Sequence, residues 1–246
     1  MSYRSMFQGY FNKFDEIKKT SNIFKNKFWI KREFNKIKRL KKLKSYEINL
    51  AKDYPLLVAS SIIYNKQKKF NIIDYGGGFG AGYLSVSRGI NGLKNLKYYI
   101  IDLPEICKLG KKIFLREKNV FFLEKFPKIK NCDIFHFGSC LQYIDDWKLL
   151  LMHTIRLKPK YIIFSDLIAG DIDGFVTLQK FDGYKMPYRF YNIKEVISFI
   201  KKKGYNLILR NNYQVHFNGI PSVLPTKKFP KKNRLDYTSN LIFKKK

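Results

Sequence analysis

Short apolar runs recur through the middle of this chain and predict the strands of a β-sheet. Helical periodicity precedes the first run, at residues 56–64, and follows the last, at residues 193–203. Strands that alternate with helices are typical of an α/β fold with a mostly parallel sheet. Residues 205–215 and 240–243 are predicted to form two further strands. The five central runs lie at residues 72–73, 97–101, 120–123, 134–138 and 160–165.

The first fifty residues have a different pattern, in which aromatic and aliphatic side chains alternate with lysines at spacings that fit amphipathic helices. This segment carries eleven Lys and three Arg against four acids, a net charge of 14 − 4 = +10. Two interpretations stay open. The apolar faces pack over the sheet and help to close a substrate site, or they rest on anionic lipid.

A glycine-rich segment follows the first central strand. Asp74 ends that strand, and Gly76, Gly77, Gly78 and Gly80 come before a predicted helix. Glycine lets the backbone turn sharply and approach a ligand closely. Ligands of open α/β sheets bind beyond the carboxyl ends of the strands, so we expect a ligand on this loop.

The charge around the loop indicates which ligand. Gly76-x-Gly78-x-x-Ala81 satisfies the loose dinucleotide fingerprint. However, the Asp74 carboxylate would face the pyrophosphate that such a loop should attract. Asp102 ends the next strand, where an acid commonly binds ribose hydroxyls. Two carboxylates favour a ligand with an ammonium and a sulfonium, and we therefore predict S-adenosylmethionine (SAM) as cofactor.

Several motifs resemble one family. They are Gly77-Gly78, Gly80 and Tyr83; residues 92–96; Ile101-Asp102 with Pro104; Gly110-Lys111; Ser139-x-Leu141-Gln142-Tyr143; Thr177-x-Gln179; and residues 9–16. Together they resemble the SAM-dependent methyltransferases carried among bacterial surface-polysaccharide genes, such as those for O antigen and lipopolysaccharide. Asp102 replaces the family's usual Glu. Asp102-Leu103-Pro104 is also similar to a motif of small-molecule O-methyltransferases.

The resemblance implies a Rossmann-like class I methyltransferase fold, with a mostly parallel seven-stranded sheet and helices on both faces. The pattern of the first fifty residues divides the chain into a basic amphipathic helical extension, residues 1–50, and a methyltransferase domain, residues 51–246. The resemblance also implies O-methylation of a sugar or another small-molecule or glycan precursor of surface polysaccharide. The cofactor-binding residues would be Asp74, Gly76, Gly77, Gly78, Gly80, Asp102, Leu103 and Ser139.

For catalysis, a hydroxyl acceptor must lose a proton, and Asp166 at the end of the fifth central strand is the first candidate base, with Asp145 or Asp146 second. Gln142, Tyr143 and Gln179 are candidate orienting residues. His136, inside the fourth strand, is interpreted as a core histidine. The family's arginine after the acid is absent here, because Leu167 follows Asp166. A different substrate, or a catalytically silent SAM-binding protein, therefore stays open.

Composition narrows the possible partners, metal sites and location of the protein. The formal charge of +30 suggests polyanion partners, but 40 of the 49 basic residues are Lys, which grips phosphates and bases less well than Arg. Specific nucleic-acid binding is therefore disfavoured, and an RNA methyltransferase is the alternative. Three cysteines without metal-ligand spacing predict neither a metal site nor a disulfide framework. With no apolar run of membrane-spanning length and no signal peptide, we expect a cytoplasmic protein, with peripheral contact to the inner membrane face. The sequence does not predict an oligomeric state.

Overall fold

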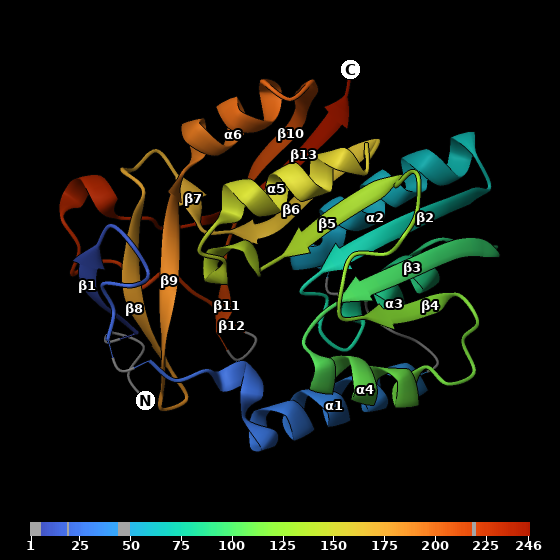
Figure 1. The fold of residues 1–246 in the computed structure, drawn as a ribbon, viewed down its shortest axis with the longest axis horizontal. Helices are drawn as coiled ribbons and strands as arrows, with labels where there is room; N and C mark the ends of the chain where they lie inside the picture. Colours follow the sequence, from blue (N-terminus) through green and yellow to red (C-terminus); the bar gives the residue numbers. More distant parts are fainter. Residues whose placement is uncertain (1–5, 19, 44–49, 218–219) are drawn as a thin grey trace.

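The structure is a computed structural model that describes residues 6–18, 20–43, 50–217 and 220–246. Its centre is a seven-stranded sheet in the order β10-β13-β6-β5-β2-β3-β4 (Figure 1). β13 is antiparallel to both neighbours and the other pairs are parallel, as predicted. The strands are β2 (Lys69–Tyr75), β3 (Asn95–Ile101), β4 (Val120–Leu123), β5 (Ile134–Gly138), β6 (Tyr161–Leu167), β10 (Tyr205–Tyr213) and β13 (Thr238–Lys245).

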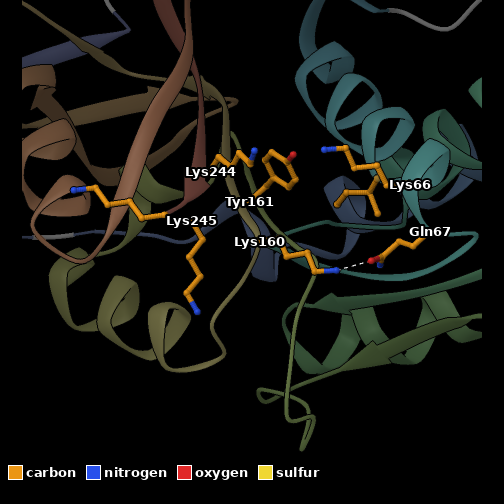
Figure 2. A pocket seen from close by; sticks show the side chains of 8 residues that line it. Lys66, Gln67, Lys160, Tyr161, Lys244 and Lys245 are labelled. Carbon is orange, nitrogen blue, oxygen red and sulfur yellow. Dashed lines mark hydrogen bonds between the residues drawn. The ribbon is translucent and has the colours of Figure 1, made fainter.

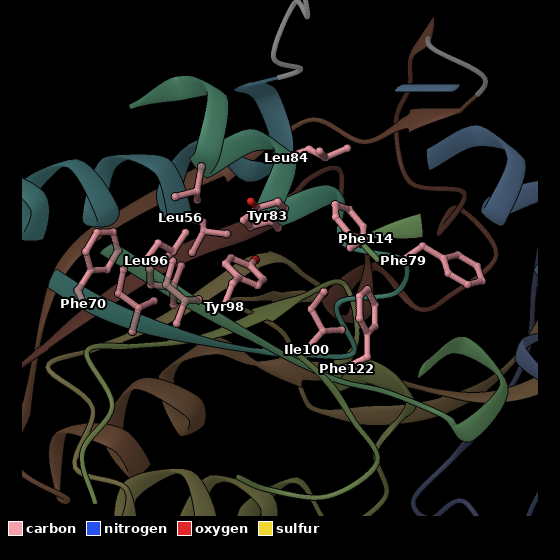
Figure 3. Close-up of a cluster of buried hydrophobic side chains, with 14 of the residues drawn as sticks. Leu56, Phe70, Phe79, Tyr83, Leu84, Leu96, Tyr98, Ile100, Phe114 and Phe122 are labelled. Carbon is pink, nitrogen blue, oxygen red and sulfur yellow. The ribbon is translucent and has the colours of Figure 1, made fainter. Parts of the chain in front are cut away.

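Helices cover both faces of this sheet because successive strand residues point to opposite sides. Ile72 is buried with the residues of α2, α3 and α4, whereas Ile73 is buried with those of α5 and α6. Figure 3 shows part of the first layer, in which Leu56 and Tyr83 pack on Tyr98. The helices are α1 (Lys27–Lys42), α2 (Leu50–Lys66), α3 (Ala81–Gly89), α4 (Pro104–Ile113), α5 (Trp147–Arg156) and α6 (Ile193–Lys201).

A second, four-stranded sheet in the order β1-β8-β9-β7 lies beside the first (Figure 1). Its strands β7, β8 and β9 form the crossing between β6 and α6, and β1 joins them from the N-terminal segment. The sheet packs on Leu224, Phe229 and Leu235 of the C-terminal loop. The strands are β1 (Phe7–Phe11), β7 (Ala169–Gly170), β8 (Phe175–Phe181) and β9 (Tyr184–Asn192). Smaller elements are η2 (Ile23–Lys25), η3 (Leu141–Tyr143), β11 (His216–Phe217), β12 (Ile220–Pro221) and η4 (Lys231–Asn233).

The helical prediction for the N-terminal segment holds for α1 and is wrong for residues 7–11. These residues form β1, which pairs antiparallel with β8. Gly9 has φ +80°, which no right-handed helix allows, and the edge of β8 supplies backbone partners instead. The segment thus joins the second sheet rather than forming a continuous helical extension.

Helix α1 packs on the core. Ile30 and Ile37 are buried in the same cluster as the sheet residues. The Arg88 guanidinium donates to the carbonyl oxygens of Leu40 and Lys41, at 3.1 and 3.0 Å. These contacts favour the packing interpretation over the lipid one. Within the described ranges, none of the helices has the length and apolar character needed to cross a membrane.

Candidate functional site

The glycine loop lies at the carboxyl end of β2, between β3 and β5. The chain continues from β2 to β3 on one side and later adds β5 on the other side. This reversal of strand order is the switch point where open α/β sheets bind ligands. Gly76 and Gly78 have φ +67° and +56°, a left-handed conformation that glycine adopts without steric cost. A Cβ atom on Gly78 would meet no atom within 4 Å, so open space borders the centre of the loop.

Asp102 closes the loop from the end of β3. Its Oδ2 accepts a hydrogen bond from the Gly78 amide at 2.8 Å, and its Oδ1 accepts one from the Leu103 amide at 2.7 Å. Burial raises the pKa of the Asp102 carboxyl, and the two amide donors offset only part of that rise. The structure therefore places Asp102, Leu103 and the glycines together, with the Asp102 carboxylate bonded to the centre of the loop.

Asp74 lies beneath the loop rather than at its surface. The residue is 2% exposed, and its Oδ2 accepts from the Tyr98 hydroxyl at 2.7 Å. A Cβ atom on Gly77 would lie 2.6 Å from the same oxygen, so glycine at this position leaves room for the carboxylate. The structure thus gives Asp74 the role of supporting the loop, whereas the sequence argument expected its charge to face the ligand.

His136 continues this buried network. Its Nδ1 lies 2.8 Å from Asp74 Oδ1, and its Nε2 lies 2.9 Å from Ser165 Oγ. A carboxylate oxygen can only accept, so Nδ1 donates to Asp74, while Nε2 and the Ser165 hydroxyl form the second contact. The prediction of a buried core histidine is confirmed. We call Tyr98, Asp74, His136 and Ser165 the cross-strand network, because they lie on β3, β2, β5 and β6 in turn.

Ser139 comes directly after β5, and Asp166 is the second-last residue of the neighbouring strand β6. Both have positive φ, +52° and +55°, which is uncommon for residues with a Cβ and marks local backbone strain. The Ser139 hydroxyl donates to Asp166 Oδ2, and the Thr238 hydroxyl donates to Oδ1 at 2.8 Å. The Asp166 amide also donates to Asn240 Oδ1 at 2.8 Å. The candidate base is thus already bonded to two hydroxyl groups.

The three candidate orienting residues come together where η3 meets the second sheet. The Tyr143 hydroxyl donates to Gln179 Oε1 at 3.0 Å. Gln142 is 3% exposed, and within the described chain its Oε1 has no hydrogen-bond partner. The Tyr143 ring makes edge contacts with Phe24 and Tyr188, with centroid distances of 5.0 and 5.1 Å. Burial raises the pKa of Tyr143 and of Tyr188.

The alternative bases have other partners. Asp146 caps α5, accepting from the Leu149 amide at 2.9 Å. Asp145 pairs with Arg189 Nη2 at 3.3 Å. Within the described ranges, His, Cys, Asp and Glu side chains form no group of three or more that could hold a metal ion.

Sequence reasoning missed several residues of this region. Thr238 and Asn240 reach Asp166 from β13, and Phe24 and Tyr188 border Tyr143. None of them belongs to a motif, and only the antiparallel pairing of β13 with β6 brings the first two to the site. Arg189 lies on β9 with its guanidinium 5.2 Å from the Phe14 ring, a position no sequence pattern indicated.

No protein-family model matches this chain, and no curated protein matches it. Solved structures do. The 1,6-didemethyltoxoflavin-N1-methyltransferase of Burkholderia thailandensis, with bound 1,6-didemethyltoxoflavin and S-adenosylhomocysteine, has a TM-score of 0.51 at 13% identity, over 93% of each chain. The magnesium protoporphyrin IX methyltransferase of Synechocystis PCC 6803, with bound S-adenosylhomocysteine, has a TM-score of 0.53 at 9% identity, over 89% of this chain and 97% of that one.

One structural neighbour catalyses a different kind of reaction. A pericyclic reaction enzyme has a TM-score of 0.52 at 12% identity, over 92% of this chain and 55% of its own. At these identities the likeness concerns the fold. The sheet order, the glycine loop at the switch point and these neighbours agree, and the chain has the α/β fold of class I SAM-dependent methyltransferases.

Proposed function

We propose that this protein binds SAM at the glycine loop and transfers its methyl group to a small-molecule acceptor. The observation that carries the proposal is the Asp102 carboxylate at the end of β3, which accepts from the Gly78 amide at 2.8 Å, while a Cβ atom on Gly78 would enter open space. An acid at this strand end suits a ligand with ribose hydroxyls, and solved structures with this fold hold S-adenosylhomocysteine.

The residues present fit this cofactor. The backbone from Gly76 to Gly80 would hold its amino-acid part, and Asp102 would accept from the ribose hydroxyls. Leu103 and Ser139 border the loop at the ends of β3 and β5 and would complete the site. Asp74 would act through the loop that it supports, because its carboxylate is buried. When bound, SAM supplies an electrophilic methyl group whose transfer leaves a neutral thioether.

For the acceptor, we propose a hydroxyl-bearing small molecule, with a sugar precursor of surface polysaccharide as the class that the motif resemblance implies. Gln142, Tyr143 and Gln179 support this proposal, because amide and hydroxyl groups orient hydroxyls without taking their protons. The buried Oε1 of Gln142 lacks a donor within the described chain, and an acceptor hydroxyl would supply one. The main contribution of such a site is alignment, which can be worth about 7–11 kcal/mol.

Asp166 is our proposed base. Its contact with the Ser139 hydroxyl would have to give way to the acceptor hydroxyl, while Thr238 keeps the second oxygen in place. A positive φ at both Ser139 and Asp166 supports a functional position, because strained backbone is concentrated at active sites.

A second candidate is a SAM-binding protein that does not methylate. The same two hydroxyl contacts favour it, because they leave Asp166 without an exposed, unengaged oxygen. The pericyclic reaction enzyme with this fold supports considering it.

Transfer of a labelled methyl group from SAM tests the proposal. Nucleotide sugars, lipid-linked sugars and total RNA are offered separately, with Asp166→Asn and the α5 cap variant Asp146→Asn compared to the wild type. We expect label in a sugar fraction that is lost in Asp166→Asn and kept in Asp146→Asn. Label in RNA alone would contradict the acceptor class. SAM binding without transfer to any fraction would favour the second candidate.

A further inference from the structure

A basic hollow lies at the opposite end of the sheet from the glycine loop. It has a volume of about 300 Å³ and lies where β6 begins and β13 ends, beside the last turn of α2 (Figure 2). Ligand sites of this fold lie at the carboxyl ends of the strands, so this hollow is separate from the proposed cofactor site. Its lining residues are Ile63, Lys66, Gln67, Lys160, Tyr161, Lys244, Lys245 and Lys246.

The lysines come from distant segments that regular structure holds together. Lys66 ends α2, Lys160 precedes β6, and Lys244 pairs with Tyr161 in the ladder between β13 and β6. The Lys245 amide donates to the Lys160 carbonyl at 2.9 Å. The sheet and the helix therefore fix the backbone at each lysine, so the cluster does not depend on a loop conformation.

The side chains of Asp133 and Gln67 hold the Lys160 side chain in place. Its Nζ lies 2.9 Å from Oδ1 of Asp133, and it also donates to the Gln67 side chain. Asp133 is buried, and its Oδ2 accepts from the Asn71 amide at 2.9 Å. This arrangement orients one ammonium group at the wall of the hollow, while the Lys160 side chain stays 53% exposed.

The remaining charge is unbalanced. In the described part of the chain, no carboxylate lies within ion-pair distance of Lys66, Lys244 or Lys245. In Figure 2 the ammonium groups of Lys66 and Lys244 lie on either side of Tyr161, whereas that of Lys245 points away from them, because successive strand residues face opposite sides of the sheet. With Asp133 against Lys160, the side chains of Lys66, Lys160 and Lys244 leave a net charge of 3 − 1 = +2 at the hollow. A polyanion would offset this unbalanced charge.

We propose that this hollow binds a small oligophosphate, the chemical class that includes pyrophosphate and nucleoside diphosphates. Lysine ammonium groups bind phosphate as point charges and need no fixed bidentate geometry. A volume of about 300 Å³ is at the lower end of the range for ligand sites, which suits a compact anion. The buried Tyr161 and Ile63 give the hollow an apolar floor, on which the charges act more strongly than in open water.

Calorimetric titration of the full-length protein with sodium pyrophosphate, at fixed ionic strength, tests this proposal. The variant Lys66→Gln/Lys244→Gln removes two charges from the hollow. Its matched control, Lys108→Gln/Lys112→Gln, removes two from the exposed face of α4. We expect saturable binding that is weaker by about tenfold in the first variant and changes by less than about twofold in the control.

Circular dichroism checks that both variants are folded, and the single variant Lys66→Gln replaces the double one if that chain unfolds. SAM affinity is measured in parallel and should not change in either variant. Equal losses in the two variants, or no saturable binding of pyrophosphate by the wild type, would overturn the proposal. Binding only to RNA, or only to vesicles of equimolar phosphatidylglycerol and phosphatidylcholine, would overturn it as well.

Discussion

At the scale of single residues, the cross-strand network is the feature that most directly supports the glycine loop. Four side chains on four neighbouring strands are joined by contacts of 2.7–2.9 Å, and Asp74 lies one residue before the end of β2. Each polar group has a partner, which is what a buried network needs in order to stabilise rather than disrupt a core. The network is expected to fix the height and orientation of the loop above Asp74.

Replacing His136 tests the network. His136→Leu leaves one Asp74 oxygen and the Ser165 hydroxyl without their partner, and we expect a loss of about 1–3 kcal/mol in the free energy of unfolding. Ser165→Ala should cost less. The double variant should cost less than the sum of the two, because both changes break the same contact. Urea unfolding of the four proteins measures this cycle. Strict additivity would show that the two residues do not interact.

The buried carboxyl of Asp102 predicts that the stability of the protein depends on pH. Because burial raises its pKa above the ordinary 3.8, the folded protein binds this proton more tightly than the unfolded chain does. The contribution of Asp102 to stability is therefore present at acid pH and lost as the pH rises through the raised pKa. Asp102→Asn should cost more stability near pH 4 than at neutrality, in urea unfolding at each pH. A cost that does not change with pH would contradict the burial argument.

At the scale of elements, the glycine loop has one glycine packed against the protein interior, Gly77, and one that borders open space, Gly78. A Cβ on Gly77 would lie 2.6 Å from Asp74 Oδ2, whereas one on Gly78 would enter open space. Gly78→Ala should cost only the left-handed backbone, about 1–2 kcal/mol. Gly77→Ala should destabilise the protein more, because the buried carboxylate must move. Denaturation measures both, and calorimetry should show weaker SAM binding by folded Gly78→Ala. Equal stability of the two variants would contradict the assignment.

Helix α1 provides another matched pair. Ile30 is buried against the core, and Phe28, two residues earlier, is 84% exposed. We expect Ile30→Ala to cost about 2–5 kcal/mol and Phe28→Ala to change stability by less than about 0.5 kcal/mol. Thermal unfolding and co-sedimentation with anionic vesicles are measured together. Weaker vesicle binding by Phe28→Ala would support contact of α1 with anionic lipid. Full stability of Ile30→Ala would contradict the packing of α1 on the core.

At the scale of the whole molecule, the sequence predicted the main sheet well. Short apolar runs located its five central strands, and the family resemblance implied the final antiparallel pair. The glycine loop and Asp102 were found because motifs at strand ends are local in sequence. The second sheet was not predicted, because β1 pairs with β8 across more than 160 residues and its own pattern fits a helix. The supporting role of Asp74 was also missed, since only the fold places His136 and Tyr98 against it.

The central claim is that the glycine loop with Asp102 binds SAM rather than a dinucleotide. Isothermal titration of the wild-type protein with SAM and with NAD, repeated with Asp102→Ala and with the exposed control Glu105→Ala, tests it most directly. We expect saturable binding of SAM, none of NAD, and an affinity for SAM that falls by about tenfold or more in Asp102→Ala alone. Binding of NAD in preference to SAM, or an unchanged affinity for SAM in Asp102→Ala, would contradict the claim.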